Sequence, residues 1–270
     1  MIIVGVDGSE AALEAARWAA REAVLHGTSL HVVHAMPAWA CDPHDGPYTE
    51  VAQWMRDGAD SLLEEAVNQA LRAEPGVEVT RARLPSDPRP ALIRAAKDAE
   101  LLVVGNHGLG GFRGLLLGSV ALGVSGFAPC PVAVVRGPAP SARSHIVLGV
   151  DGAESGANAV EFAFAEAERR GVELLVVHGA AEATGPQERC VPAEVIESCK
   201  DRHPGTKVIE QSVPGHPVDV LQQASEDAAL LVVGSRGRGG FTGLVLGSVS
   251  HAVLHHARCP VVVVPARYGD

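Results

Sequence analysis

The feature that most constrains the fold of this chain is an internal repeat. The stretch GNHGLGGFRGLLLGS at 105–119 returns as GSRGRGGFTGLVLGS at 234–248, an offset of 129, with all six glycines in register. A second pair, IIVGVDGSE near the start and IVLGVDGAE at 146–154, repeats at an offset of 144. Self-similarity over this distance predicts two copies of one structural unit. The difference between the offsets, 144 minus 129, predicts that the second copy is 15 residues shorter.

Short β-branched runs alternate with longer Ala-rich segments, a pattern typical of βαβ units in a parallel sheet. In the first half we expect strands at 2–6, 30–35, 77–83, 101–105 and 131–135, and helices at about 10–26, 50–73, 89–98 and 115–127. In the second half we expect strands at 145–150, 172–178, 206–212, 230–234 and 260–264. The predicted fold class is α/β, with two tandem doubly wound open parallel sheets, each with five strands and four helices.

A proline-rich piece, RGPAPSARS at about 136–144, predicts the linker between the halves. We therefore expect a first domain at 1–137, a linker at 138–144 and a second domain at 145–270, which suits a chain of 270 residues. The shortening falls on the helix around VPAEVIESCKDRH, which replaces VAQWMRDGADSLLEEAVNQALRA of the first half. This helix is separate from both glycine stretches, so we expect the deletion to leave the second site intact.

The net charge and the cysteine pattern limit which partners and which cellular compartment are expected. A formal net charge of −10 argues against binding to nucleic acid or to an anionic membrane. The five cysteines form no CxxC pair, which argues against a disulfide framework and a structural zinc site. The sequence opens without a basic, apolar leader, and no run reaches the roughly 20 apolar residues of a membrane helix. We expect a cytoplasmic protein.

The glycine stretch itself predicts a phosphate site. Glycine costs roughly 0.5–1 kcal/mol relative to alanine in regular structure, so six in 15 positions imply a need for bare backbone. Between a strand and a helix, such backbone presents N–H groups and the positive end of the helix dipole to an anion. No Lys follows Gly118, so this is not a Walker A loop, and GxGxxG is missing from the first strand-to-helix turn. A tight structural turn is the alternative reading of the glycines.

Both halves resemble universal stress protein domains. The residues that carry the resemblance are GVDGS near the start and GVDGA in the second half, the pattern GxxG, nine residues, then GS, and the closing CPVAVV and CPVVVV. The resemblance implies a Rossmann-like, adenine-nucleotide alpha-hydrolase-like fold that binds ATP, usually with Mg²⁺ or Mn²⁺. It implies that Asp7 and Asp151 close the adenosine side and that the backbone after His34 and His178 lines the adenine pocket. Capping of the following helix is the alternative role for Asp7 and Asp151.

The same resemblance implies that the glycine stretches and their serines hold the ribose and the phosphates. The nucleotide-binding residues expected in the first half are Gly5, Asp7, Ala35, Gly105, Gly108, Gly110, Gly118, Ser119 and Val120. Those expected in the second half are Gly149, Asp151, Gly179, Gly234, Gly237, Gly239, Gly247, Ser248, Val249 and Ser250. Ser250 corresponds to Ala121, and Arg236 to His107, so we expect the second half to bind the triphosphate more tightly. No catalytic residue and no metal ligand is predicted.

The function predicted on this basis is an ATP-binding regulator of stress response or dormancy, non-catalytic or with only slow hydrolysis. One alternative is an ATPase or adenylyl-transferring enzyme on the same fold, and another is a nucleotide-independent protein-binding module. The apolar last strands imply that the two halves pair with each other as in a dimer. Further pairing into a homodimer is left open, and we expect a regulatory protein partner that the sequence does not name.

Overall fold

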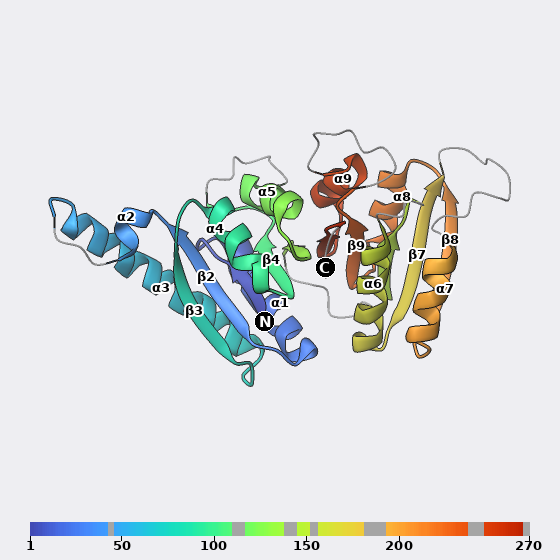
Figure 1. The fold of residues 1–270 in the computed structure, drawn as a ribbon, viewed down its shortest axis with the longest axis horizontal. Helices are drawn as coiled ribbons and strands as arrows, with labels where there is room; N and C mark the ends of the chain where they lie inside the picture. The colour runs from blue at the N-terminus through green and yellow to red at the C-terminus, as the bar shows by residue number, and fades with distance from the viewer. Residues whose placement is uncertain are drawn as a thin grey trace. The chain divides into compact units, whose positions relative to one another are not determined.

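The computed structural model describes residues 1–42, 46–109, 117–137, 145–151, 156–180, 193–236 and 246–266. The chain separates into two compact units, Met1–Gly137 and Pro138–Asp270, which are described one at a time. The linker predicted at 138–144 lies outside the described residues. Each unit is a parallel α/β structure, as the alternation of strand and helix patterns predicts (Figure 1).

The first unit is built on five parallel strands in the order β3-β2-β1-β4-β5. Their bounds are β1 Ile2–Gly5, β2 Leu30–Met36, β3 Val79–Pro85, β4 Leu101–Gly105 and β5 Val132–Val135. The central strands β1 and β4 are uninterrupted apolar runs, as expected for strands covered on both faces. The order reverses between β1 and β4, which are direct neighbours, and ligands of open α/β sheets bind beside such a reversal.

The second unit repeats this arrangement, with the strand order β10-β9-β6-β7-β8. Its strands are β6 His145–Gly149, β7 Glu173–Ala180, β8 Val208–Pro214, β9 Leu230–Gly234 and β10 Val261–Val264. Its described helices are α6 Ala157–Arg170, α7 Ala193–Arg202, α8 Pro217–Ala224 and α9 Ser248–His256. The corresponding order reversal lies between β6 and β9.

The helices of the first unit form a layer on each side of the sheet (Figure 1). Helix α1 (Glu10–His26) packs against α3 (Thr49–Ala73), while α4 (Pro88–Ala95) packs against α5 (Ser119–Phe127). Alanines give α1 a narrow buried face that lies close to the strands. Its N-cap is Ser9, whose side chain accepts a hydrogen bond from the Ala12 amide, and its C-cap is Gly27, in the left-handed region.

Three sequence expectations for the first unit need correction. The helix expected from 115 begins at Ser119, because Gly118 is in an extended conformation that precedes the first helical residue. The helix expected at 89–98 ends at Ala95 and is followed by a 3₁₀ turn, Ala96–Asp98. A short helix, α2 (Ala38–Cys41), was not expected and adds to the four helices predicted for this half. Its single turn is too brief to show a helical period.

The shortening of the second copy falls between the second strand and the end of the helix that follows it, where residues 181–192 lie outside the described residues. Helix α3 has 25 residues, and its counterpart α7 has 10. The first unit therefore carries a long helix beside β2 and β3, and the described part of its counterpart in the second unit is shorter. No helix among the described residues is both long and apolar enough to cross a membrane.

Cys130 shows how closely the core packs where a strand begins. The side chain is 2% exposed just before β5, and burial raises the pKa of its thiol from 9.0 to about 12. A raised folded-state pKa contributes stability that is fully present below pH 9 and is lost as the pH rises towards 12. We expect the stability advantage of the wild type over Cys130→Ala to shrink above pH 9. Urea unfolding of both proteins at pH 7 and pH 10.5 measures this difference, and a constant difference would contradict the burial effect.

Candidate functional site

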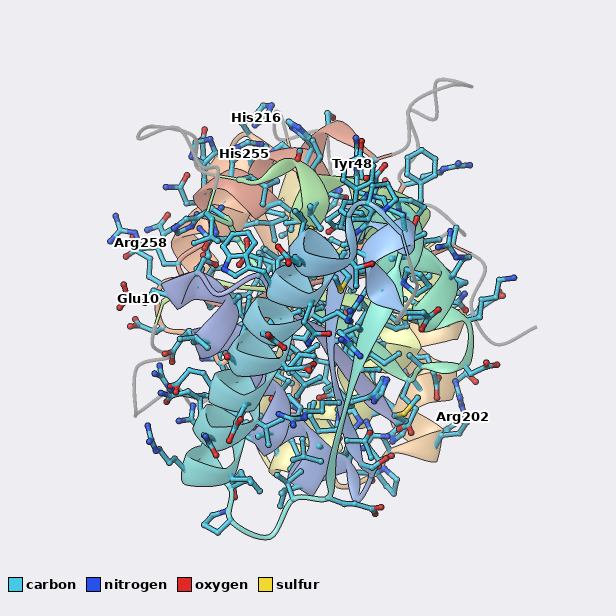
Figure 2. The ribbon with its side chains drawn as sticks, turned by 90° about the vertical axis from the view of Figure 1, so that its left-hand side faces the viewer. Glu10, Tyr48, Arg202, His216, His255 and Arg258 are labelled. Carbon is cyan, nitrogen blue, oxygen red and sulfur yellow. The ribbon has the colours of Figure 1, made fainter. Side chains whose placement is uncertain are left out.

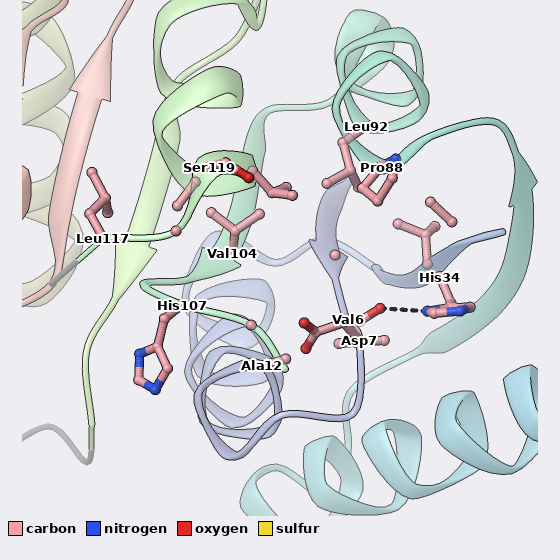
Figure 3. A pocket seen from close by; sticks show the side chains of 18 residues that line it. Val6, Asp7, Ala12, His34, Pro88, Leu92, Val104, His107, Leu117 and Ser119 are labelled. Atoms are coloured by element: carbon pink, nitrogen blue, oxygen red, sulfur yellow. Dashed lines mark hydrogen bonds between the residues drawn. The ribbon is translucent and has the colours of Figure 1, made fainter. Parts of the chain in front are cut away.

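A cavity of about 330 Å³ opens in the first unit beside the carboxyl ends of β1 and β4. Three segments meet there: the loop after β1, the first part of the glycine stretch after β4, and the start of α5 (Figure 3). The parallel register sets Gly5 opposite Val104, so the two loops leave the sheet side by side. The cavity therefore lies at the order reversal of this sheet.

The structure gathers most of the residues predicted for the first site around this cavity. The predicted residues in its lining are Gly5, Asp7, Ala35, Gly105, Gly108, Gly118, Ser119 and Val120. Gly110 lies outside the described residues. That these residues bind a nucleotide remains a prediction, but residues more than 100 positions apart in the sequence do share one cavity.

Asp7 ties the first loop to the glycine stretch. Its carboxylate accepts hydrogen bonds from the Ser9 amide at 3.0 Å and from the Leu109 amide at 3.1 Å. The cap of α1 is Ser9, so the alternative role of Asp7 as the helix cap is not what the structure shows. A Cβ on Gly108 would lie 2.2 Å from the Asp7 carboxylate, which occupies the space that a side chain would need.

The beginning of α5 faces the cavity without a side-chain cap. Gly118 is its N-cap residue and offers no side chain, and its own amide donates to the Asn106 carbonyl at 2.6 Å. The first amides of a helix have no intrahelical acceptor, and here they belong to Ser119, Val120 and Ala121, all in the cavity lining. Helix α1 also starts beside the cavity, but Ser9 caps it. Only the start of α5, of these two, is arranged to receive an anion.

Two glycines of the stretch lie close to the protein's own backbone, and at Gly105 the approach is too close for a side chain. A Cβ on Gly105 would lie 2.7 Å from the Ala11 carbonyl carbon and 2.8 Å from its oxygen, both in the backbone of α1. A Cβ on Gly118 would lie 3.3 Å from the His107 Cα. The expectation that these glycines serve a ligand is therefore incomplete, because Gly105 also allows a helix to approach a strand end.

The opposite wall of the cavity is apolar and comes from β2 and α4. Val33, Ala35, Pro88 and Leu92 line it, together with His34, whose ring Nδ1 lies 2.8 Å from the Val6 carbonyl oxygen. Figure 3 shows this bond beside Asp7. The sequence analysis did not identify several lining residues, namely Val6, Ala12, Val33, Pro88, Leu92, Val104, His107, Leu117 and Ala121. A glycine pattern holds no signal for α4, which reaches the site only through the fold.

The second unit repeats parts of this framework. The Gly247 amide donates to the Ser235 carbonyl at 2.8 Å, as Gly118 does to Asn106, and α9 likewise starts without a side-chain cap. Of the residues predicted for this site, the structure describes Gly149, Asp151, Gly179, Gly234, Gly247, Ser248, Val249 and Ser250. Gly237 and Gly239 lie outside the described residues.

Three details distinguish the second unit. The Ser250 hydroxyl is buried and donates to the Gly234 carbonyl at 2.6 Å, so it can offer a ligand only its oxygen lone pairs. A Cβ on Gly179 would lie 2.6 Å from the Pro217 Cα, whereas the matching residue of the first unit, Ala35, carries a Cβ. Helix α8 therefore approaches its strand more closely than α4 does. His178, the counterpart of His34, has a buried Nδ1 without a hydrogen-bond partner among the described residues.

Comparisons with known proteins agree with this architecture. Residues 1–136 and 142–265 each match the universal stress protein family. A universal stress protein of Mycobacterium tuberculosis is 38% identical over 284 residues, covering 97% of this chain and 95% of the relative. A crystal structure of a universal stress protein from Archaeoglobus fulgidus matches the fold with a TM-score of 0.74, at 21% identity over 98% of both chains.

A second Archaeoglobus fulgidus universal stress protein was solved in complex with dAMP. It is 28% identical, covers 50% of this chain and 96% of its own, and has a TM-score of 0.37. The family match spans both units, and the mycobacterial relative is similar over nearly the full length. This chain therefore belongs to the universal stress protein family and contains the family domain twice in tandem.

Proposed function

We propose that the first-unit cavity binds an adenine nucleotide, ATP with a divalent cation, and that the protein acts as a nucleotide-dependent regulator of stress response or dormancy. The observation that carries this proposal is the uncapped start of α5, whose amides line a cavity that also has an apolar wall. Unpaired amides at the start of a helix donate to phosphate oxygens, and an apolar wall can pack against the base of a nucleotide. A volume of about 330 Å³ lies in the range of small-molecule sites.

The lining residues fit the two ends of a nucleotide. The Ser119 hydroxyl and the amides of Ser119 and Val120 are donors for phosphate oxygens at one end. At the other end, Ala35, near the end of β2, and Pro88 offer a flat apolar contact. Asp7 lies between these ends and is the carboxylate in the cavity lining. A divalent cation bound by phosphates and one or two carboxylates would fit beside it.

A regulatory role suits the side chains that line the cavity. Among the described lining residues, the ionisable groups are Asp7, His34 and His107. The Asp7 carboxylate already accepts two backbone amides, and one nitrogen of His34 is bonded to Val6. This set binds and orients a charged ligand and offers few groups for proton transfer. We propose that occupancy of the cavity shifts a conformational or association equilibrium, with slow ATP hydrolysis as the most that the site catalyses.

Calorimetric titration of the full chain with Mg·ATP tests the proposal. We expect binding in the micromolar to low millimolar range, weaker binding of GTP, and loss of the ATP binding that belongs to the first-unit site when that site is blocked by Ala35→Trp. No affinity for any adenine nucleotide at millimolar concentration would overturn the proposal. Incubation with labelled ATP at single-turnover ratio separates a binder from an ATPase or adenylyl-transferring enzyme, because a binder leaves the ATP intact for hours.

The associations of the protein belong to the same proposal. We propose that the two units pair with each other, that the site of the second unit also takes an adenine nucleotide, and that a protein partner responds to the occupied state. The net charge of −10 favours partners other than nucleic acid and anionic membranes. A cytoplasmic location, where ATP is abundant, suits this function.

A further inference from the structure

Four large apolar side chains are exposed together at one end of the first unit. They are Trp39 on α2, Tyr48 at the start of α3, and Val51 and Trp54 on its first two turns, and we call them the aromatic patch. Trp54 is 76% exposed and Tyr48 is 64% exposed. Figure 2 labels Tyr48 on the side of the first unit that it turns towards the viewer. Contiguous exposed apolar side chains of this kind mark interaction sites more often than isolated ones do.

The aromatic patch rests on a packed base. Met36, Ala40, Cys41, Ala52 and Ala59 form a buried cluster beneath α2 and the start of α3, and Met55 packs against it. The rings of Trp39 and Tyr48 meet edge to face, with centroids 6.3 Å apart. The exposed rings are therefore displayed by helices that are anchored from below.

A buried arginine fixes the two helices to each other. Arg56 of α3 is 4% exposed, and its guanidinium donates to the carbonyl oxygens of Ala40 at 3.1 Å and of Asp42 at 3.2 Å. It also donates to the Gln53 side chain at 2.7 Å. These bonds satisfy carbonyl groups at the end of α2 and add to the packing of Ala40 and Cys41 in the buried cluster. A preorganised surface loses less entropy when a partner binds.

The charged side chains exposed on the first part of α3 are acidic, and one of them, Asp60, is paired with Arg83 of β3 at 3.7 Å. The exposed charged side chains in the range 46–65 are all acidic, namely Glu50, Asp57, Asp60, Glu64 and Glu65. Glu50 and Asp57 are four residues before and three residues after Trp54, so both flank it on the helix surface. The one basic residue in this range, Arg56, is buried. Complementary charge is a main source of specificity at interfaces, so a cationic partner fits this face.

We propose that the aromatic patch docks a basic amphipathic segment of another protein. Apolar side chains of that segment pack on Trp54, Tyr48 and Val51, while its Lys or Arg side chains pair with Glu50 and Asp57. Anionic lipid and nucleic acid would be repelled by these carboxylates. A second copy of this chain docked face to face would bring like charges together. The surface is specific to the first unit, because the shorter α7 carries no aromatic residue.

Fluorescence anisotropy with two labelled 18-residue helical peptides tests the proposal on the full chain. One peptide has Leu on one face and Lys on the other, and the second has Glu in place of Lys. We expect the basic peptide to bind and the acidic one not to bind. The double variant Trp54→Ala/Tyr48→Ala should weaken binding of the basic peptide about tenfold or more. Leu71→Ala, which alters an exposed residue at the far end of α3, is the matched control and should bind as the wild type does.

The charge assignment has its own variant, Glu50→Lys/Asp57→Lys, which should reduce binding of the basic peptide and create binding of the acidic one. All substituted residues are exposed, so circular dichroism should show an unchanged fold. Equal binding of both peptides by the wild type, or unchanged binding by the Trp54→Ala/Tyr48→Ala variant, would overturn the proposal. Self-association of the wild type through the aromatic patch would also overturn the proposal, because the occupant would then be a second copy of this chain. The sign of this would be self-association that the Trp54→Ala/Tyr48→Ala variant loses and that the basic peptide does not compete with.

Discussion

Gly105→Ala is expected to destabilise the first unit by about 3 kcal/mol, at the upper end of overpacking effects. The new Cβ would lie 2.7 Å from the Ala11 carbonyl carbon and 3.0 Å from the Ala12 amide nitrogen. Both atoms belong to the backbone of α1, and the helix is held in place by buried alanines and by its Ser9 cap. A flexible side chain could move away, but here a whole helix or strand must shift.

The three tryptophans make this measurement selective. Trp18, Trp39 and Trp54 all lie in the first unit, so tryptophan fluorescence during urea unfolding follows that unit alone. Gly58→Ala is the matched control, because a Cβ on this mid-helix residue of α3 meets no atom within 4 Å. It should stabilise the unit by about 0.5–1 kcal/mol, as alanine does in helices. Equal unfolding midpoints for the two variants would show that the backbone of α1 does not exclude a side chain at position 105.

Gly108→Ala and Asp7→Ala are each expected to weaken ATP binding about tenfold or more, and the double variant no further than either one. The reason is that the Gly108 side-chain space is filled by the Asp7 carboxylate, 2.2 Å from the position of a Cβ. Either change removes the bond from the Leu109 amide to Asp7 and separates the first loop from the glycine stretch. A hydrogen bond to a charged group contributes about 1.5–3 kcal/mol.

Calorimetry on the wild type, both single variants and the double variant gives the complete cycle. Asp151→Ala, the same change at the corresponding position of the second unit, is the control and should leave the affinity of the first site unchanged. If the changes in binding free energy caused by Gly108→Ala and Asp7→Ala add in full, the two residues act separately and the proposed steric coupling between them is contradicted. If neither variant changes the affinity, Asp7 is not part of a nucleotide site.

The fold could be predicted from the sequence because its signals are local and occur twice. The runs IIVG and LLVVG are strands in the structure, and α1 and α3 lie within one residue of their expected bounds. The order of the strands follows from the right-handed connections of parallel sheets. These rules act over tens of residues and need no knowledge of side-chain contacts.

What the sequence missed depends on contacts between distant segments. The need for glycine at 105 comes from Ala11, and the need for glycine at 108 comes from Asp7, each about 100 positions away. Pro88 and Leu92 enter the cavity because α4 packs beside β2. The role of Arg56 was equally hidden, since an arginine on a helix is usually exposed to solvent and this one is buried under α2.

The contact between Gly179 and Pro217 limits how the two halves of this chain can exchange parts. Real Cβ atoms essentially never approach another heavy atom within 3.0 Å, and this one would stand 2.6 Å from Pro217. Alanine is accommodated at the same point of the first unit, so the residue and the helix spacing form a matched set. If β2 were transplanted without α4 into the second half, the Cβ of Ala35 would clash with Pro217. Transplanting β2 and α4 together would avoid this clash.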